Sequence, residues 1–290
     1  MTDSDVITLT NGEFGATLSP LDRGLAYGDG LFETARVRAG QVPLWSFHRE
    51  RLIAGARRLG LALALDTERI EREREQLLAR LPAVNGSLKL VVTRGIGGKA
   101  YQPPKHPQIS YCWQLRPGVS PTWQKGGDGV VLHECRQRLG DNPLLAGMKH
   151  LNRLEYVLAR MEWGDEYPEG LLSDAAGHII EGTLSNVFIR LEDGWWTPCL
   201  DRNGVAGVMR RLIMEVLGPQ LDLVVQEGQV TRDALIGARE WFVCNSVFGI
   251  WPVTGLAPGG ETWAVGPQTR QLQSGFEHWL ADNRNLKEVP

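Results

Sequence analysis

Residues 145–158 read LAGMKHLNRLEYVL and place Lys149 just before a run of regularly spaced apolar residues. That spacing predicts an amphipathic helix from about His150 to Trp163. Its apolar side chains are Leu151, Leu154, Leu158 and Met161. Apolar residues also precede Lys149 closely, and desolvation disfavours an ammonium group, so this lysine is a candidate nucleophilic amine. A lysine at a helix start can also extend to water along its aliphatic stem, and the spacing alone leaves both interpretations open.

Lysine is rare in this chain, which shortens the list of candidate amines. The six lysines are Lys89, Lys99, Lys105, Lys125, Lys149 and Lys287. Lys89 alternates with apolar residues in a predicted strand and is expected to face solvent. Three others lie in loops rich in glycine or proline, and Lys287 lies in the tail. Lys149 is therefore the lysine whose surroundings differ from those of the rest.

Length and composition are those of an ordinary globular protein. The 290 residues suffice for one large domain or two of common size, and 42% hydrophobic with 22% charged residues is typical of such domains. The net charge of -3 gives no reason to expect a nucleic acid or a membrane as partner. Four scattered cysteines, a polar N-terminus and no apolar run of roughly 20 residues favour a reduced, soluble, cytoplasmic enzyme.

The order of the predicted elements indicates a mixed fold. The predicted strands are 32–40 (FETARVRAG, ending in a turn), 88–93, 109–115, 130–134, a β-rich block over 170–197, and 241–245. The predicted helices are 47–59, 67–81 with Asp66 or Thr67 as its cap, 150–163 and 207–217. A stretch rich in glycine and proline, 116–129, is expected to connect two lobes. Strands and helices do not alternate regularly, so the fold class is α+β or mixed α/β.

Several familiar motifs can be excluded. RGIGGKA (94–100) lacks the first glycine and the closing serine or threonine of a P-loop, and no helix-opening small residue follows it as in dinucleotide-binding proteins. His133 and Glu134 are not followed by a second histidine at metalloprotease spacing, so no metal site is expected. A Gly-x-Ser-x-Gly elbow does not occur in the sequence.

Five segments together resemble one family of enzymes. LAGMKHLNRLEYVL closely matches the lysine segment of the aminodeoxychorismate lyases, which belong to the fold-type-IV pyridoxal-phosphate enzymes. IIEGTLSNVFI resembles the second signature of that family, and three further segments match in the same order. These are DRGLAYGDGLFETARV (22–37), GVAGVMR (204–210) and CNSVFGIWPV (244–253). The resemblance implies conversion of 4-amino-4-deoxychorismate to p-aminobenzoate and pyruvate, a step of folate biosynthesis.

The resemblance also implies the architecture and the assembly. A small N-terminal α/β domain would cover residues 1–117, and an interdomain loop would cover 118–128. A larger C-terminal domain with a β-barrel-like core would cover 129–290. Members of the family are homodimers with sites near the subunit interface, so a homodimer is expected here.

The implied cofactor is pyridoxal 5'-phosphate. Lys149 would hold it as a Schiff base and, once displaced by the substrate amine, would transfer protons as the catalytic residue. Glu181 corresponds to the carboxylate that pairs with the pyridine nitrogen, which keeps the ring a good electron acceptor. Arg51 matches the arginine of the phosphate site and could bind bidentately. Val208 and Met209 would donate backbone N–H groups at a helix start, where free amides favour an anion, and Ser246 would add a hydroxyl.

Substrate contacts are expected in the loop after the second predicted strand. Aminodeoxychorismate carries two carboxylates, so cationic groups are needed, and Arg94 and Lys99 are the candidates, with Tyr101 behind them. Asn245 would contribute through its side chain or backbone. Lys99 as a simply solvated loop residue is an equally open interpretation.

Two other functions remain as rivals. A D-amino-acid or branched-chain aminotransferase of the same family would use the same lysine. Phe32, where the D-amino-acid enzymes have tyrosine, and the Asn-Arg-Leu-Glu that follows Leu151 favour the lyase, whereas Glu33 is compatible with either activity. A non-catalytic cofactor-binding protein is the second rival, and retention of Lys149, Glu181 and Arg51 together argues against it.

Overall fold

The computed structural model describes residues 5–118 and 126–282, which form two compact units. The first unit contains residues 5–118 together with Lys149–Asn152, and the second contains 126–148 and 153–282. Lys125, Lys287 and most of the predicted interdomain loop lie outside the described residues. The predicted limits of the domains therefore stay a prediction.

A five-stranded antiparallel sheet forms the centre of the first unit. Its order is β2-β1-β5-β4-β3, and β3 is an edge strand. The strands are β1 (Ile7–Thr10), β2 (Glu13–Phe14), β3 (Gly30–Val37), β4 (Gly86–Thr93) and β5 (Ser110–Pro117). Three of the predicted strands are thus confirmed, and β1 and β2 were not predicted.

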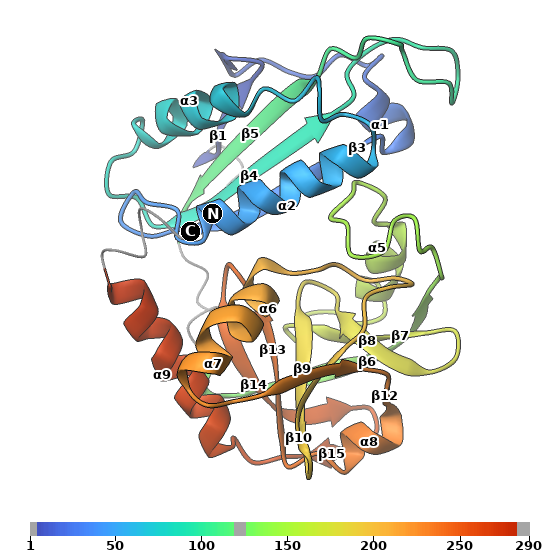
Figure 1. Ribbon diagram of the computed structural model, residues 1–290, viewed down its shortest axis with the longest axis vertical. Coiled ribbons are helices and arrows are strands. Elements are labelled where there is room, and N and C mark those ends of the chain that lie inside the picture. The colour runs from blue at the N-terminus through green and yellow to red at the C-terminus, as the bar shows by residue number, and fades with distance from the viewer. Residues whose placement is uncertain (1–4, 119–125, 283–290) are drawn as a thin grey trace. The chain divides into compact units, whose positions relative to one another are not determined.

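Two long helices cover one face of this sheet, as Figure 1 shows, and bury its apolar side chains. The helices of the unit are α1 (Arg23–Tyr27), α2 (Trp45–Arg58) and α3 (Thr67–Leu78). The side chain of Asp66 accepts a hydrogen bond from the backbone N–H of Arg69, which confirms the predicted cap of α3. On the other face of the sheet, alternate side chains of β3 and β4 are only half-buried.

The second unit is built around a closed barrel of six strands. The pairing runs β9-β13-β14-β6-β7-β8, and β8 pairs with β9 to close the ring. Leucine, isoleucine, valine and tryptophan side chains form its core, as expected for a small barrel filled by its own side chains. The strands are β6 (Val130–Leu139), β7 (Gly170–Asp174), β8 (His178–Gly182), β9 (Asn186–Leu191), β10 (Gly194–Pro198), β11 (Val225–Gly228), β12 (Val230–Thr231), β13 (Glu240–Asn245), β14 (Gly249–Ala257) and β15 (Glu261–Thr262).

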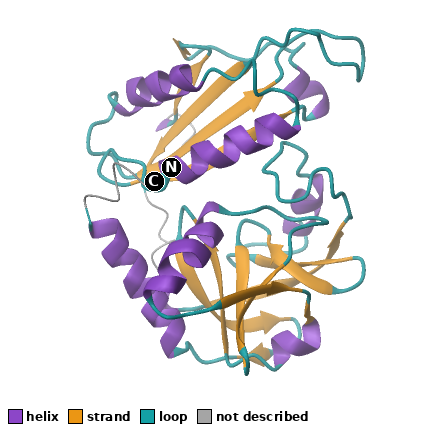
Figure 2. Ribbon diagram, viewed as in Figure 1, coloured by secondary structure: helices purple, strands orange, loops and turns teal. Residues whose placement is uncertain are grey.

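Helices lie around the strands of this unit (Figure 2). They are η2 (Gly126–Asp128), α5 (Leu154–Arg160), α6 (Val208–Leu212), the π-helical η3 (Ile213–Leu217), α7 (Gly218–Gln220), α8 (Arg232–Ile236) and α9 (Pro267–Ala281). Within the described residues, none of the helices is long and apolar enough to span a membrane.

The predicted helix after Lys149 differs from the observed one in two respects. Helix α5 begins at Leu154, because the residues after Lys149 are extended and hydrogen-bond to β3 instead. The predicted apolar side of the helix is also mostly exposed. Of the predicted side chains, Leu154 (76%), Leu158 (52%) and Met161 (75%) are exposed, and Val157 (51%), which was not among them, is exposed as well. The spacing of apolar residues predicted the apolar stripe of the helix, but it could not show whether other residues of the same chain bury that stripe.

Candidate active site

Lys149 lies beside the outer edge of β3 in the first unit. Its carbonyl accepts a hydrogen bond from Phe32 N (3.0 Å), and Leu151 N donates to the carbonyl of Gly30 (3.1 Å). The half-buried side chain places Nζ 4.4 Å from the centroid of the Phe32 ring. Backbone pairing with a strand thus fixes the position of the candidate amine more firmly than a helix start would.

Lys89 is the lysine whose predicted position was wrong. It is half-buried rather than solvent-facing, and its Nζ lies 5.3 Å from the centroid of the same Phe32 ring. The strand register explains this, because Lys89 pairs with Thr34 and shares its face of the sheet with Phe32. Alternation correctly predicted that Lys89 leaves the apolar face, but it could not show what lies on the other face.

Arg51, the predicted phosphate-binding residue, forms an ion pair with buried Glu33. Arg51 Nε donates to Glu33 Oε1 (2.9 Å), and Nη2 donates to Oε2. Burial raises the pKa of Glu33, but the charge of Arg51 and the hydrogen bonds from His48 and Arg51 outweigh it and lower that pKa to about 2. Two N–H groups of Arg51, which were expected to bind the cofactor phosphate, therefore bind the carboxylate of Glu33 instead.

His48 completes this cluster. It is fully buried, and its Nδ1 lies 2.6 Å from Glu33 Oε2. Burial lowers the pKa of His48, so the neutral ring donates its Nδ1 proton to Glu33. Nε2 then carries a lone pair, and within the described residues it has no hydrogen-bond partner.

Glu181 is the centre of a second group of polar contacts, located in the second unit. The carboxylate is 3% exposed. Tyr156 Oη donates to Oε1 (2.5 Å), while Val205 N (2.9 Å) and Asn186 Nδ2 (3.3 Å) donate to Oε2. Burial, followed by the charge of Glu181, raises the pKa of Tyr156, so the phenol keeps its proton and acts as a donor. All three donors are uncharged, so they orient the carboxylate without cancelling its charge.

The backbone just before Lys149 is tied to the same group. Gly147 exchanges hydrogen bonds with the residues on either side of Val205, and the Arg153 guanidinium donates to the carbonyl of Met148 (2.8 Å). Arg153 also lies over the ring of Tyr156, 4.9 Å from its centroid. The residue that precedes Lys149 in the chain is therefore anchored by the loop and the helix that hold Glu181.

Helix α6 begins next to Asn186. A Cβ on Gly207, which precedes the helix, would lie 2.0 Å from Asn186 Oδ1, so this position requires glycine. Glycine has no side chain to cap the first-turn N–H groups of Val208 and Met209. Ser246, the remaining predicted phosphate ligand, lies half-buried in the turn between β13 and β14.

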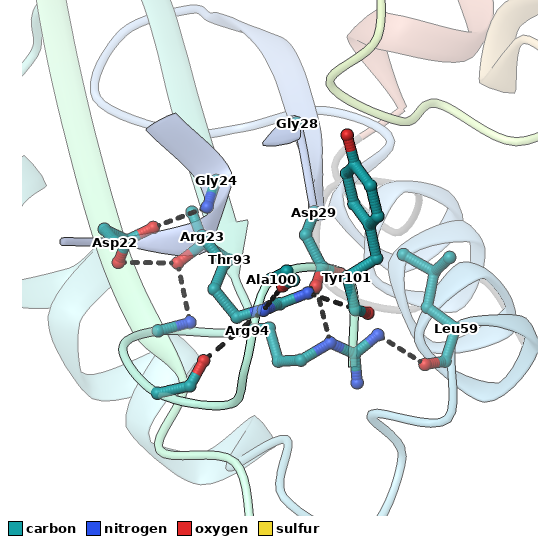
Figure 3. Close-up of polar contacts among 12 residues, drawn as sticks. Asp22, Arg23, Gly24, Gly28, Asp29, Leu59, Thr93, Arg94, Ala100 and Tyr101 are labelled. Carbon is teal, nitrogen blue, oxygen red and sulfur yellow. Dashed lines mark hydrogen bonds and ion pairs between the residues drawn. The ribbon is translucent and has the colours of Figure 1, made fainter. Parts of the chain in front are cut away.

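The loop candidates for substrate binding differ in their surroundings. Arg94 is buried and donates to Asp29 (2.8 Å) and to the carbonyl of Leu59 (2.8 Å), as Figure 3 shows. Arg23 also donates to Asp29 and reaches the carbonyls of the glycine-rich loop. Arg94 thus uses these donors to hold the loop, and a substrate contact through the same atoms would break those bonds.

Lys99 and Tyr101 lie on the outside of that loop. Lys99 is exposed, and Tyr101 is 83% exposed with its ring 5.4 Å from that of Tyr27. Asn245, in the second unit, accepts from Val247 N and Phe248 N and donates to the carbonyl of Leu184. Its side chain therefore stabilises the turn after β13.

Sequence reasoning missed several polar side chains of these groups, among them His48 and Arg153. Tyr156 and Asn186 lie within the matched segments, but their hydrogen bonds to Glu181 are recognisable only once the barrel is closed. Glu33 was considered as a family position and not as the partner of Arg51. Glu169, 1% exposed, accepts from both backbone and hydroxyl groups of the turn after Glu181. No local pattern marks such long-range contacts.

The donor set fits pyridoxal phosphate. A buried carboxylate held by neutral donors suits a protonated ring nitrogen, and a helix start without a side-chain cap suits a phosphate. A half-buried lysine amine suits the aldehyde. Within the described residues, no cluster of three or more histidine, cysteine, aspartate or glutamate side chains that could hold a metal ion occurs.

The fold and these groups define a class of protein, and comparison with known proteins agrees. The model of the family described as Amino-transferase class IV matches residues 30–256. The chain belongs to this family. It has a fold-type-IV structure, with a six-stranded barrel and a separate small antiparallel sheet.

Three relatives give the family a finer context. An aminodeoxychorismate lyase of Vibrio harveyi is 36% identical over 262 residues, which are 87% of this chain and 93% of the relative. The crystal structure of 4-amino-4-deoxychorismate lyase from Pseudomonas aeruginosa is 43% identical, with a TM-score of 0.86 over 95% of this chain and 99% of that chain. A Mycobacterium tuberculosis hypothetical aminotransferase in a PLP-bound form has the same fold, at 22% identity and a TM-score of 0.77 over 93% of this chain and 98% of that chain. Proteins of this fold therefore include pyridoxal-phosphate binders.

Proposed function

We propose that the protein is an aminodeoxychorismate lyase that converts 4-amino-4-deoxychorismate to p-aminobenzoate and pyruvate in folate biosynthesis. The observation that carries the proposal is the similarity, over most of the chain, to two proteins with that name. The aminotransferase in the comparison is more distant, at 22% identity.

Pyridoxal phosphate is the proposed cofactor. When bound, it supplies an aldehyde for the lysine amine and a conjugated ring that accepts an electron pair. Lys149 would hold the aldehyde, and Glu181 would face the ring nitrogen as a carboxylate whose charge its neutral donors leave intact. Val208 and Met209 N–H groups and Ser246 would bind the phosphate, and Arg51 would contribute charge from its pair with Glu33.

We assign both proton transfers of the reaction to the side-chain amine of Lys149. The Nζ of Lys149, displaced by the substrate amine, removes the proton from the amine-bearing carbon as a general base. Loss of the enolpyruvyl group as the enolate of pyruvate makes the ring aromatic. Nζ, now protonated, gives this proton to the enolate carbon, which yields pyruvate and restores the free amine. Since aromatisation favours the products, the protein mainly positions groups.

Substrate binding is proposed for the loop after β4 and the turn after β13. Lys99 and Tyr101 have exposed side chains, while Arg94 and Asn245 would act from the contacts described above. If the substrate binds to the backbone groups of Arg94 and Asn245, the side-chain hydrogen bonds of both residues stay intact.

A homodimer is the proposed assembly, in the cytoplasm. The exposed apolar side of α5 supports it, because such a stripe on a helix commonly marks an interface. The four free cysteines suit a reducing compartment. Sedimentation equilibrium that gives only the 32.2 kDa monomer at micromolar protein concentration would contradict the dimer.

The test is to incubate the protein, loaded with the cofactor, with aminodeoxychorismate and to measure p-aminobenzoate and pyruvate together. Equal amounts of both are expected. Lys149→Ala should lower turnover at least about 1000-fold and remove the borohydride-sensitive visible absorption, because Lys149 is the proposed Schiff-base amine and proton carrier. Lys105→Ala, at an exposed loop position, is the control. If the cofactor-loaded protein released neither p-aminobenzoate nor pyruvate, the lyase function would be refuted. The next step would then be to test amino donors for an aminotransferase.

A further inference from the structure

The half-buried face of the sheet in the first unit holds a second ammonium group near Lys149. Lys89 Nζ and Lys149 Nζ lie 5.3 Å and 4.4 Å from the centroid of the Phe32 ring. The two ammonium groups therefore cannot be more than 9.7 Å apart, the sum of those distances. A buried or half-buried pair of like charges at this range is unfavourable unless an anion lies between or beside them.

Lys89 receives no such anion from the part of the chain that the structure describes. Among the described residues, the contact that the structure gives the Lys89 ammonium is the ring of Phe32, and no carboxylate lies within ion-pair distance. A cation over a phenyl ring contributes only about 0.5–1 kcal/mol at a partly exposed site. An ordinary surface lysine would extend to water instead of resting on this ring.

The surroundings of Lys89 are suited to a planar anionic ligand. Phe32 and Val91 are paired across β3 and β4 on the same face, and they provide an apolar surface for a ring. Thr34, directly opposite Lys89, adds a hydroxyl to that face. An apolar platform beside an ammonium group is the usual arrangement for an aromatic or cyclic carboxylate.

We propose that Lys89 binds the ring carboxylate of the substrate while the amine of the same molecule is handled at Lys149. This inference rests on the proposed lyase function and names the residue that reads its substrate. The ring carboxylate lies para to the amine, and one ring plus a hydrogen bond separates the two lysine nitrogens by roughly 9 Å. That separation is within the 9.7 Å limit. The side-chain carboxylate, which leaves with pyruvate, needs a different partner.

The test compares two ligands that differ in one group. p-Aminobenzoate carries the ring carboxylate, and p-aminobenzamide replaces it with a neutral amide of the same shape. Binding of each to the cofactor-loaded enzyme is measured by tryptophan fluorescence, in wild type and in Lys89→Met. Wild type should prefer the carboxylate by about 10- to 100-fold, as expected for a charge-assisted hydrogen bond, and K89M should lose that preference.

Variants and controls separate binding from a structural effect. K89M should raise the KM for aminodeoxychorismate by a similar factor with a smaller change in kcat, and Lys89→Arg should recover part of it. Lys105→Met removes the same charge from an exposed loop and should change nothing.

Three outcomes overturn the proposal. In the first, the wild-type enzyme binds p-aminobenzoate and p-aminobenzamide with equal affinity. In the second, K89M loses affinity for both ligands by the same factor. In the third, K89M binds both ligands as K105M does. Each differs from failure of the lyase function itself, in which wild type releases neither p-aminobenzoate nor pyruvate.

Discussion

Two buried glutamates, one in each unit, are held in opposite ways. Glu33 is 2% exposed and Glu181 is 3% exposed. Glu33 is paired with the cation of Arg51 and accepts a hydrogen bond from neutral His48. Glu181 accepts hydrogen bonds from a phenol, an amide and a backbone N–H, and none of these three donors carries charge.

The difference between their partners indicates a structural role for Glu33 and a functional role for Glu181. The ion pair of Glu33 is complete within the protein, so its role is to orient Arg51 and His48. The three donors named for Glu181 make ionisation tolerable without adding a positive charge, so the carboxylate can stabilise a cationic ligand atom. Equal burial therefore does not mean equal function, and the nature of the partners distinguishes a structural from a functional acid.

Glu181→Gln should give the largest effect, on chemistry. Removing the charge removes the stabilisation of a protonated ring nitrogen, and kcat/KM should fall about 100- to 1000-fold. Thermal stability should change little, because the glutamine oxygen can still accept from Val205 N and Asn186 Nδ2 while its NH2 group donates to Tyr156 Oη. Steady-state kinetics and a melting curve on the same preparation measure both. A melting temperature reduced as much as in Glu33→Gln would break the comparison.

Glu33→Gln should instead affect stability. It leaves the Arg51 cation without its buried partner, which costs about 3 kcal/mol in the free energy of unfolding. Urea unfolding of the cofactor-free protein measures this. Unchanged stability would show that Arg51 is solvated and the pair is not structural.

The same pair predicts a pH dependence. Because the pKa of Glu33 is lowered from 4.5 to about 2, its contribution is complete above pH 4.5 and is lost as the pH falls toward 2. The stability difference between wild type and E33Q should therefore be constant from pH 8 to pH 5 and narrow below about pH 4.5. A difference that widens on acidification would contradict the assigned ionisation.

Tyr156→Phe should give the smallest effect and sharpen the comparison. Loss of one donor to a buried carboxylate should weaken cofactor binding about 5- to 10-fold, measured by titration of the visible absorption. Tyr167→Phe is the matched control, since Tyr167 packs against the same apolar cluster. In the E181Q background, Y156F should add little, because its partner is already changed. Full additivity would show that Tyr156 acts on packing rather than through Glu181.

Local patterns predicted several strands and helices of the fold but missed its longest helix, α9 (Pro267–Ala281). Alternation identified β3, β4 and β5, and capping chemistry identified the start of α3 at Asp66. The six-stranded closure was expected only from the family resemblance, because pairing between β8 and β9 and between β6 and β14 depends on register across the unit. Helix α5 was predicted too long for a similar reason, since β3 competes for the residues after Lys149.

In the candidate site, too, local motifs predicted some residues, whereas others could be found only from the fold. Short motifs pointed to Lys149 and Glu181, whose neighbours in sequence carry the signatures. The residues that hold them were beyond such reasoning, because Tyr156 and Val205 reach Glu181 from 25 and 24 positions away. Lys89 shows the limit clearly, as its alternation gave the correct face of the sheet and the wrong surroundings.

The pairing of Lys149 and Leu151 with β3 has a consequence for the first unit as a separable piece. β3 is the last strand of its sheet, and this short segment occupies hydrogen-bonding groups of Gly30 and Phe32 on its outer edge. A fragment that ends at residue 118 would lack that cover and present a bare strand edge, a template for aggregation. The lysine segment thus also protects the sheet against self-association, and supplying residues 149–152 should restore solubility to such a fragment.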